Sequence, residues 1–288
     1  MDSDQLACDR DHVSIRPPRD CGLEGVRMEQ DLRQQVAIVT GAGRGIGRSI
    51  ALALAAEGVS VGVFARTQQE IAETAALITN AGGRAIAIPL DVRDAAGIRA
   101  AVDDTARRLG PITLLVNNAG TPGPAGLDWE VDPDAWFECI DVIVRGAFLL
   151  CQAIVPGMIH QGSGRIINIA SISGTRPFPP IIATSIAKTA LIRFSEGLAA
   201  QLAPHGVRVF AIHPGVVRTR LLESYGLQIP DDWYVGPERA GSLCARLASG
   251  RYDALSGRFI GIDDDLDELV NRAGEIAARE LYTLRIQS

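Results

Sequence analysis

The sequence predicts an α/β protein whose core is a doubly wound parallel sheet of about seven strands with helices on both faces. The first observation is that, after residue 33, short β-branched runs alternate regularly with longer stretches of helical pattern. The second is a glycine-rich segment at 41–47, directly after the first of these runs. Strands that alternate with helices usually pair in parallel, because each helix carries the chain back along the sheet.

The predicted elements follow one another without a break. Strands are predicted at 36–40, 60–65, 84–89, 113–117, 164–170, 207–212 and 258–262. Helices are predicted near 45–57, 67–81, 94–109, 132–158, 182–203, 237–249 and 266–279. Acidic residues at 263–265 precede the last helix and place negative charge at its positive end. Because single α/β domains reach about 250 residues, we expect one domain from 34 to 288.

The first strand and the following helix are joined by a loop that contains Gly41, Gly45 and Gly47. Glycines at these positions let the chain turn sharply, bring backbone N–H groups close to a pyrophosphate and pack the helix on the strand. This is the Rossmann-type arrangement for a dinucleotide. A tight turn that binds no ligand has the same local sequence, so the loop alone leaves both interpretations open.

Further motifs follow in a fixed order along the chain. They are Thr40 before the glycines, Asp91–Val92, the NNAG segment at 117–120, Ser171, Lys188 and the PGVVRT segment at 214–219. From about residue 34 to about residue 262, this order and spacing resemble the short-chain dehydrogenase/reductase superfamily. The resemblance implies a Rossmann-type fold, a nicotinamide cofactor and chemistry on a carbonyl group.

The resemblance assigns many of these residues to cofactor binding. The implied contacts are Thr40, Gly41, Arg44, Gly45, Ile46, Gly47, Arg66, Asp91, Val92, Asn118, Lys188, Pro214, Gly215, Val217 and Thr219. Asp91 resembles the family's adenine contact, and Asn118 resembles an asparagine that stabilises the backbone. Each of the two can equally be an ordinary turn residue.

The charges near the second strand favour NADP(H) over NAD(H). Members of the family that use NAD usually end this strand with an acid that accepts the ribose hydroxyls, whereas residues 64–67 of this chain contain none. Arg66 follows the strand and Arg44 lies in the glycine loop, so two guanidinium groups can bind a 2′-phosphate. The alternative is that both arginines are solvated surface charges.

The resemblance breaks down at the catalytic residues. In the family a tyrosine exchanges a proton with the substrate oxygen, a lysine makes that tyrosine more acidic, a serine steadies the oxygen and an asparagine holds a relay water. Ser171 and Lys188 match, but Thr184 occupies the tyrosine position and Ile143 the asparagine position. Threonine is a far weaker acid than a phenol and is shorter by a ring. The usual proton donor is therefore expected to be missing.

Three functions are left open. The favoured one is non-redox carbonyl chemistry, such as isomerisation, dehydration or cyclisation, with Ser171, Lys188 and Thr184 as the catalytic residues. The second is an NADPH-dependent carbonyl reductase whose proton comes from Lys188, from water or from a lid phenol such as Tyr225 or Tyr234. The third is a non-catalytic NADP-binding subunit. Substrate identity is not determined by the sequence.

Apolar and aromatic segments indicate a small hydrophobic carbonyl substrate. Residues 177–182 make one pocket wall apolar, and an aromatic insertion near 217–236 resembles a substrate lid. A subunit contact and a surface loop are the respective alternatives. The apolar helices near 132–158 and 182–203 are those that the family pairs across a twofold axis, so a homodimer or homotetramer is expected.

Composition limits the partners and the location. A formal net charge of -6 argues against a nucleic-acid partner. No apolar run approaches the ~18 residues that span a bilayer, and the N-terminus lacks the pattern of a secretion signal, so we expect a cytoplasmic protein without a membrane partner. Scattered cysteines and histidines predict no metal site. Residues 1–33 are polar and aperiodic and are expected to be a flexible extension, within which Met28 is an alternative start.

Overall fold

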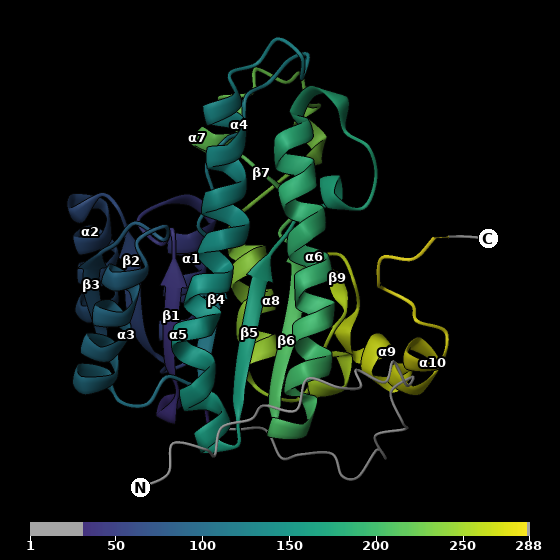
Figure 1. Cartoon of the computed structure of the whole chain (residues 1–288). Coiled ribbons are helices and arrows are strands. Elements are labelled where there is room, and N and C mark those ends of the chain that lie inside the picture. The colour runs from purple at the N-terminus through teal and green to yellow at the C-terminus, as the bar shows by residue number, and fades with distance from the viewer. Residues whose placement is uncertain (1–30, 287–288) are drawn as a thin grey trace, which may run out of the picture.

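The protein is built on one parallel sheet of seven strands (Figure 1). The computed structural model describes residues 31–286. The strands lie in the order β3-β2-β1-β4-β5-β6-β9. They are β1 (Val36–Thr40), β2 (Ser60–Ala65), β3 (Ala85–Pro89), β4 (Leu114–Asn117), β5 (Gly164–Ile169), β6 (Val207–His213) and β9 (Phe259–Gly261). The seven predicted strands and the predicted fold class are confirmed.

Helices cover both faces of this sheet, as Figure 1 shows. One face carries α3 (Ala95–Leu109), α5 (Gly146–Gln161) and α6 (Ile182–Leu202), and the other carries α1 (Gly45–Ala56), α2 (Gln68–Asn80) and α8 (Glu238–Ala248). Alternate residues of β1 enter two separate apolar clusters: Ala37 and Val39 pack with α1, whereas Val36 and Ile38 pack with α3 and α5. This alternation follows from the twofold period of a strand.

The strand order reverses between β1 and β4, which are hydrogen-bonded neighbours. In doubly wound sheets, ligands bind outside the carboxyl ends of the strands at this switch point. The glycine loop leaves β1 and the NNAG segment leaves β4 at that edge, while the segments that follow β5 and β6 leave the same edge further along. The topology therefore brings most of the predicted motifs together.

The predicted helix near 132–158 is one continuous helix of 29 residues, Pro133–Gln161. It consists of α4 (Pro133–Ile140), a π-helical turn (Asp141–Arg145) and α5. Its length and apolar composition would allow it to cross a membrane. In the structure, Leu150 and Met158 of this helix are buried in the apolar cluster beneath it.

Three features of the chain after β6 differ from the prediction. A small parallel sheet of β7 (Val216–Val217) and β8 (Tyr234–Val235) was not predicted, because two-residue strands carry no periodicity. The segment between them, which was predicted as a lid, contains α7 (Arg220–Glu223). The single helix predicted at 266–279 was wrong: it is divided at Arg272 into α9 (Leu266–Asn271) and α10 (Ala273–Ala278). Asp265 caps α9 by accepting hydrogen bonds from two backbone N–H groups of its first turn.

The remaining elements are single turns of 3₁₀-helix. They are η1 (Leu32–Gln34), η3 (Ile172–Gly174), η4 (Pro179–Ile181), η5 (Ala203–His205), η6 (Asp231–Trp233) and η7 (Asp253–Leu255). Residues 1–30 of the predicted flexible extension lie outside the described residues. Leu32 already packs against the apolar core, so ordered contacts begin before residue 34.

Candidate active site

The loop between β1 and α1 has a geometry that requires glycine. Gly41 and Gly45 have φ angles of 63° and 54°. A Cβ atom on Gly47 would lie 2.3 Å from the carbonyl oxygen of Gly41. Arg44 is the N-cap of α1 and makes no side-chain capping bond. The first-turn N–H groups of α1 are thus not capped by that side chain, and the positive end of the helix suits a pyrophosphate.

Asn118 and Thr40 fix this loop against β4. The side-chain amide of Asn118 donates to the carbonyl oxygens of Thr40 and Gly41 at 2.9 and 3.3 Å. The Thr40 hydroxyl accepts from the backbone N–H groups of Asn118 and Ala119, both at 3.0 Å. These contacts correspond to the backbone-stabilising position expected for Asn118, and they hold the glycine loop in one conformation.

Asp91, the expected adenine contact, is engaged by a neighbouring arginine. The Arg93 guanidinium hydrogen-bonds both carboxylate oxygens, with its shortest contact at 2.6 Å. This side-chain hydrogen bond lowers the pKa of Asp91. Val92 is buried, and its side chain lies against Gly146, where a Cβ atom would come within 2.7 Å of it.

The segment after β6 passes beside the glycine loop. Pro214 leads into Gly215, which has a φ of 80° and lies so close to Ile262 that a Cβ atom would come within 2.4 Å. Val217 is buried in β7. The methyl group of Thr219 lies 3.4 Å from where a Cβ on Gly45 would be. The start of the lid therefore lies close to the expected pyrophosphate site.

The two arginines predicted to bind a 2′-phosphate have different charged neighbours in the structure. Arg44 pairs with Glu70 of α2 at 2.9 Å, whereas Arg66 is exposed and its positive charge lowers the pKa of Asp91. Arg220 of the lid joins Arg44 instead, because it also pairs with Glu70, at 3.3 Å. Sequence analysis missed both Glu70 and Arg220. Glu70 lies in the first turn after β2, which is a detectable position for an acid, whereas no local pattern indicates Arg220.

Ser171 and Lys188 lie at the carboxyl edge of β5 and on α6. The Ser171 hydroxyl accepts hydrogen bonds from the backbone N–H and the hydroxyl of Ser173, at 3.2 and 3.1 Å. The Lys188 ammonium donates to the carbonyl oxygen of Ile169 at 2.5 Å. Burial lowers the pKa of Lys188 to about 8. The ammonium therefore gives up its proton more readily than an ordinary lysine does.

The Thr184 hydroxyl lies at the centre of a buried polar cluster. It is 2.6 Å from the Tyr225 hydroxyl and accepts a hydrogen bond from the backbone N–H of Gly123 at 3.3 Å. The thiol of Cys139 on α4 is 3.5 Å away. Thr184 and Tyr225 are only 6% and 8% exposed. The structure thus places the phenol of Tyr225 in contact with Thr184, the residue that stands where the family resemblance places a tyrosine.

Titration of this cluster is dominated by burial. Burial raises the pKa of Tyr225, and the hydrogen bond to Thr184 acts in the opposite direction. Burial also raises the pKa of Cys139. Tyr234, the other lid phenol considered from the sequence, has its ring 4.0 Å from the Arg218 guanidinium. Only Tyr225 of these two makes a hydrogen bond to Thr184 in the described structure.

The position of the family's relay asparagine is apolar. Ile143 lies in the π-helical turn, is 3% exposed and packs in a cluster with Cys139, Ala147 and Leu191. The Ile143 side chain has no polar atom, so it cannot hold a relay water. His213, next to the PGVVRT segment, accepts a hydrogen bond from the Ile172 backbone N–H through Nδ1, which fits a packed residue.

The described residues contain no group of three or more His, Cys, Asp or Glu side chains that could hold a metal ion. Cys139, Cys151 and Cys244 are free and buried, while Cys8 and Cys21 lie outside the described range.

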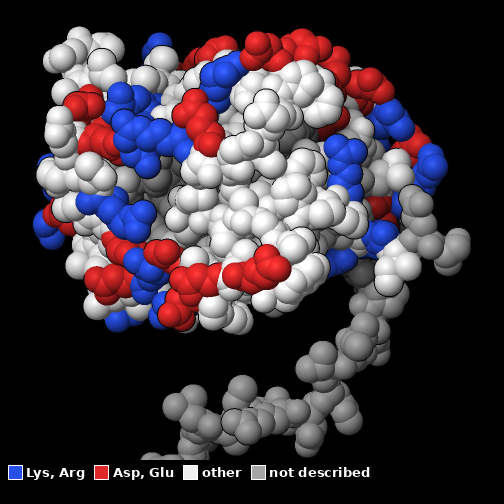
Figure 2. Space-filling model, turned by 90° about the horizontal axis from the view of Figure 1, so that it is seen from above, with Lys and Arg blue, Asp and Glu red and all other residues white. Residues whose placement is uncertain are grey.

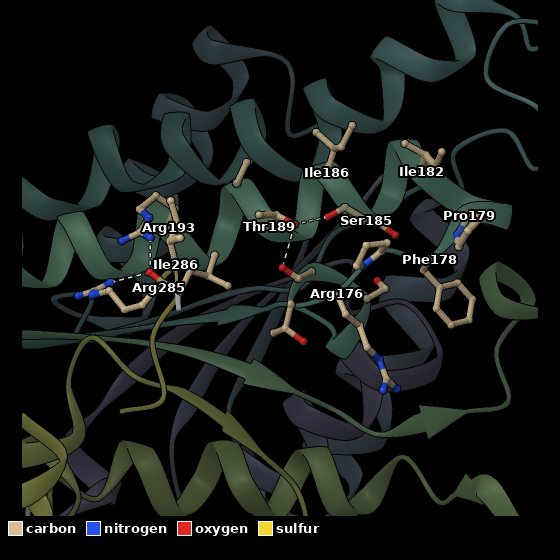
Figure 3. A pocket seen from close by; sticks show the side chains of 16 residues that line it. Arg176, Phe178, Pro179, Ile182, Ser185, Ile186, Thr189, Arg193, Arg285 and Ile286 are labelled. Atoms are coloured by element: carbon tan, nitrogen blue, oxygen red, sulfur yellow. Dashed lines mark hydrogen bonds between the residues drawn. The ribbon is translucent and has the colours of Figure 1, made fainter. Parts of the chain in front are cut away.

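A hollow of about 660 Å³ lies along α6 (Figure 3). By the period of the helix, the α6 residues that line it lie on the face opposite Thr184 and Lys188. Ile182, Ile186 and Phe178 line it, together with Ile286 near the C-terminus. Phe178 and Ile182 belong to the segment expected as a substrate wall. Substrate wall and subunit contact both stay predictions for this segment.

Comparisons with known proteins agree with this geometry. The short chain dehydrogenase family model matches residues 35–229. The chain is 34% identical over 254 residues to the short chain dehydrogenase tazN of Aspergillus terreus, covering 85% of this chain but only 56% of that protein. It is 36% identical over 239 residues to a 3-oxoacyl-[acyl-carrier-protein] reductase of Synechocystis sp., covering 81% of this chain and 96% of that protein.

A solved structure gives the same result. The crystal structure of NAD+-bound xylitol dehydrogenase matches with a TM-score of 0.76 and 28% sequence identity, over 81% of this chain and 99% of that chain. The chain therefore belongs to the short-chain dehydrogenase/reductase family, and its Rossmann-type fold is that of a family of oxidoreductases that use nicotinamide cofactors.

Proposed function

We propose that this member of the short-chain dehydrogenase/reductase family is an NADP(H)-dependent oxidoreductase that acts on the carbonyl group of a small hydrophobic compound. The observation that carries the proposal is the 2.6 Å contact between the hydroxyls of Tyr225 and Thr184. Tyr225 supplies from the lid the phenol that is absent from α6. The enzyme then has a relocated proton donor rather than a missing one.

The position of Tyr225 suits this role. The Tyr225 hydroxyl lies one hydrogen-bond length from the Thr184 hydroxyl. This extra distance makes up for part of the length by which threonine is shorter than tyrosine. Burial raises the pKa of Tyr225, so the phenol stays protonated near neutral pH, as the acid of a reductase must. Thr184 receives the Gly123 N–H bond and can donate its own hydroxyl proton to a developing phenolate.

A bound nicotinamide cofactor supplies the hydride that reduces the carbonyl carbon. The uncapped first turn of α1 and the glycine loop fit the pyrophosphate of such a cofactor. Arg44 and Arg220 lie beside a hollow of about 370 Å³ next to the glycine loop, where guanidinium groups favour a 2′-phosphate. Lys188 is the family's ribose ligand, and its lowered pKa also makes it a candidate for returning a proton to the phenol.

The surface around the site favours an apolar substrate. Figure 2 looks onto the molecule from above the view of Figure 1 and shows a broad area of uncharged side chains bordered by charged ones. Trp129 and Trp233 are 79% and 62% exposed, which is high for tryptophan and is typical of a binding surface. The relative from Synechocystis is a 3-oxoacyl reductase by name, and an apolar oxo compound of that chemical class fits here.

The decisive experiment measures NADPH oxidation and product mass in parallel, with a panel of apolar ketones, 3-oxo esters and quinones. We expect a product two mass units heavier than its substrate and a loss of ~10² to 10⁴ in kcat for Tyr225→Phe. Tyr234→Phe is the matched control, because it removes a lid phenol that lies beside Arg218. Unchanged turnover in Tyr225→Phe would overturn the assignment of the proton donor.

Ile143 supports a second candidate function, non-redox carbonyl chemistry. Its burial among apolar side chains removes the relay that normally reprotonates the active site after each reduction. Isomerisation, dehydration or cyclisation with Ser171, Lys188 and Thr184 needs no net proton uptake from solvent. A product of unchanged mass, or one lighter by a water molecule, without NADPH consumption would favour this function.

We also propose that the protein is a cytoplasmic homo-oligomer. Ile182 and Ile186 on the outer face of α6, and Phe148 on α5, are 36%, 44% and 48% exposed. Exposed aliphatic and aromatic side chains on neighbouring helices are typical of a subunit interface. A second copy of the chain would remove them from water, and the size of the particle in solution tests this.

A further inference from the structure

One carboxylate oxygen joins the glycine loop to the lid. Oε1 of Glu70, in the first turn of α2, pairs with Arg44 at 2.9 Å and with Arg220 at 3.3 Å. Arg44 immediately precedes α1, and Arg220 is the first residue of α7. The Glu70 side chain packs against the loop: a Cβ atom on Gly43 would come within 2.8 Å of the Glu70 Cβ.

These groups line the hollow of about 370 Å³ next to the glycine loop, together with Thr67, Gln69, Arg48 and Glu73. Arg48 is held in place, since it hydrogen-bonds the Gly43 carbonyl and Thr74 and pairs with Glu73. The Arg44 and Arg220 side chains are 53% and 73% exposed, whereas that of Glu70 is 22% exposed. Arg44 and Arg220, the two exposed arginines that can change partners, therefore share the Glu70 carboxylate.

We propose that Glu70 occupies the position of a cofactor 2′-phosphate, and that Glu70 and Arg220 together determine how strongly this chain prefers NADP(H) to NAD(H). This inference rests on the proposed function for the class of cofactor. In Rossmann-type sites the adenosine ribose lies between the glycine loop and the end of β2, which is where Thr67 and Gln69 line the hollow.

The chemistry of the exchange follows from charge. A phosphate monoester carries up to two negative charges and three acceptor oxygens, so it binds two guanidinium groups better than a single carboxylate does. A 2′-phosphate bound in this hollow would repel the Glu70 carboxylate and pair with Arg44 and Arg220 in its place. A 2′-hydroxyl carries no charge, so NAD(H) leaves Glu70 on its two arginines.

The exchange also couples the cofactor to the lid. Arg220 begins the segment that carries Tyr225, five residues further on. If Arg220 pairs with the cofactor phosphate instead of Glu70, the start of the lid is linked to the bound nucleotide. The 2′-phosphate therefore orders the lid more strongly than the 2′-hydroxyl does, and this effect reaches the segment that places the phenol beside Thr184.

The test uses binding of 2′,5′-ADP and 5′-AMP to the full chain by calorimetry, without any turnover. Arg220→Ala is expected to weaken 2′,5′-ADP about tenfold, the usual effect of losing one charge-assisted hydrogen bond. Glu70→Gln is expected to strengthen 2′,5′-ADP by about the same factor, because it removes the competing charge. Binding of 5′-AMP should not change in either variant.

Arg218→Ala is the matched control, because Arg218 is also an exposed lid arginine but pairs with Asp231. Limited trypsin digestion gives an independent measure: 2′,5′-ADP should protect the lid more than 5′-AMP does, and Arg220→Ala should abolish the difference. Equal 2′,5′-ADP affinity in the wild type and in Arg220→Ala would overturn the inference and leave the oxidoreductase proposal intact. Failure of the wild-type protein to bind either nucleotide would overturn both proposals.

Discussion

The nucleotide half of the molecule, built on β1 and β4, and the catalytic half, built on β5, β6 and the lid, place their functional groups in different ways. In the first half, Thr40, Gly41 and Asn118 hold one another through backbone and side-chain hydrogen bonds. In the second half, the phenol beside Thr184 arrives from Tyr225, 41 residues away.

The difference has a physical cause. A pyrophosphate is bound by successive backbone N–H groups, and these can be arranged only by a contiguous loop whose glycines permit the necessary conformation. A proton donor is a single oxygen atom, which any nearby segment can supply. The two halves therefore differ in how far a functional group can move along the chain without loss of its role, and the variants below test this for Tyr225.

The largest expected effect comes from moving the phenol back to α6. Tyr225→Ala should lower kcat by ~10² to 10⁴, because it removes the positioned acid. Adding Thr184→Tyr to this variant should restore at least a tenth of the lost rate, since the space left by Tyr225 can hold the new ring. The measurement is steady-state NADPH oxidation. If the double variant is as slow as Tyr225→Ala alone, the relocated-donor interpretation of the catalytic half is wrong.

The second prediction concerns Lys188 and the stability of the catalytic half. Burial lowers the pKa of Lys188 from 10.5 to about 8, so between these two values the unfolded chain binds more protons at this site than the folded protein does. The free energy of unfolding should therefore rise with pH across this window, by at most about 3 kcal/mol from this group.

The measurement for Lys188 is urea unfolding at pH 7.5, 9 and 10.5, with Lys188→Met as the reference. Background titrations cancel in the difference between the two proteins. The wild type should gain stability relative to Lys188→Met as the pH rises, and parallel pH curves for the two proteins would contradict the prediction.

The third prediction tests the nucleotide half. Gly47→Ala places a Cβ atom 2.3 Å from the Gly41 carbonyl oxygen, so the loop must shift. We expect a loss of about 1 to 3 kcal/mol in unfolding free energy, and much weaker nucleotide binding. Gly157→Ala in the exposed part of α5 is the control, since it meets only the end of a flexible glutamine and should stabilise the helix by up to about 1 kcal/mol. Equal stability of the two variants would argue against a tightly constrained loop.

The smallest effect on activity is expected on the outer face of α6. Ile186→Asp should convert the proposed oligomer to a monomer in light scattering while changing the turnover per chain by less than about threefold, because this face lies opposite Thr184. Gln201→Asp changes an exposed position of α6 that does not line the hollow of about 660 Å³, and it should leave the assembly unchanged. A wild-type protein that is already monomeric at micromolar concentration would contradict the assembly proposal.

The sequence by itself determined the fold class, the seven strands of the main sheet and the geometry of the glycine loop. These features depend on local periodicity and on glycine's access to positive φ, and both are visible within a few consecutive residues. The absence of a phenol at 184 and of a polar side chain at 143 could also be predicted, because each position is defined by its distance from a motif. The division of the last helix at Arg272 and the two-residue strands of the lid could not, because they depend on packing rather than on pattern.

Only the tertiary structure decided which side chains meet. Tyr225 and Tyr234 were equivalent as lid phenols in the sequence, and the fold brings only the first of them to Thr184. Arg44 and Arg220 meet through Glu70, a contact that the sequence did not indicate. Such contacts join residues far apart in the chain, and their geometry depends on how the segment from Val217 to Gly236 packs on the rest of the fold. The local sequence around each residue does not indicate which distant residue it will contact.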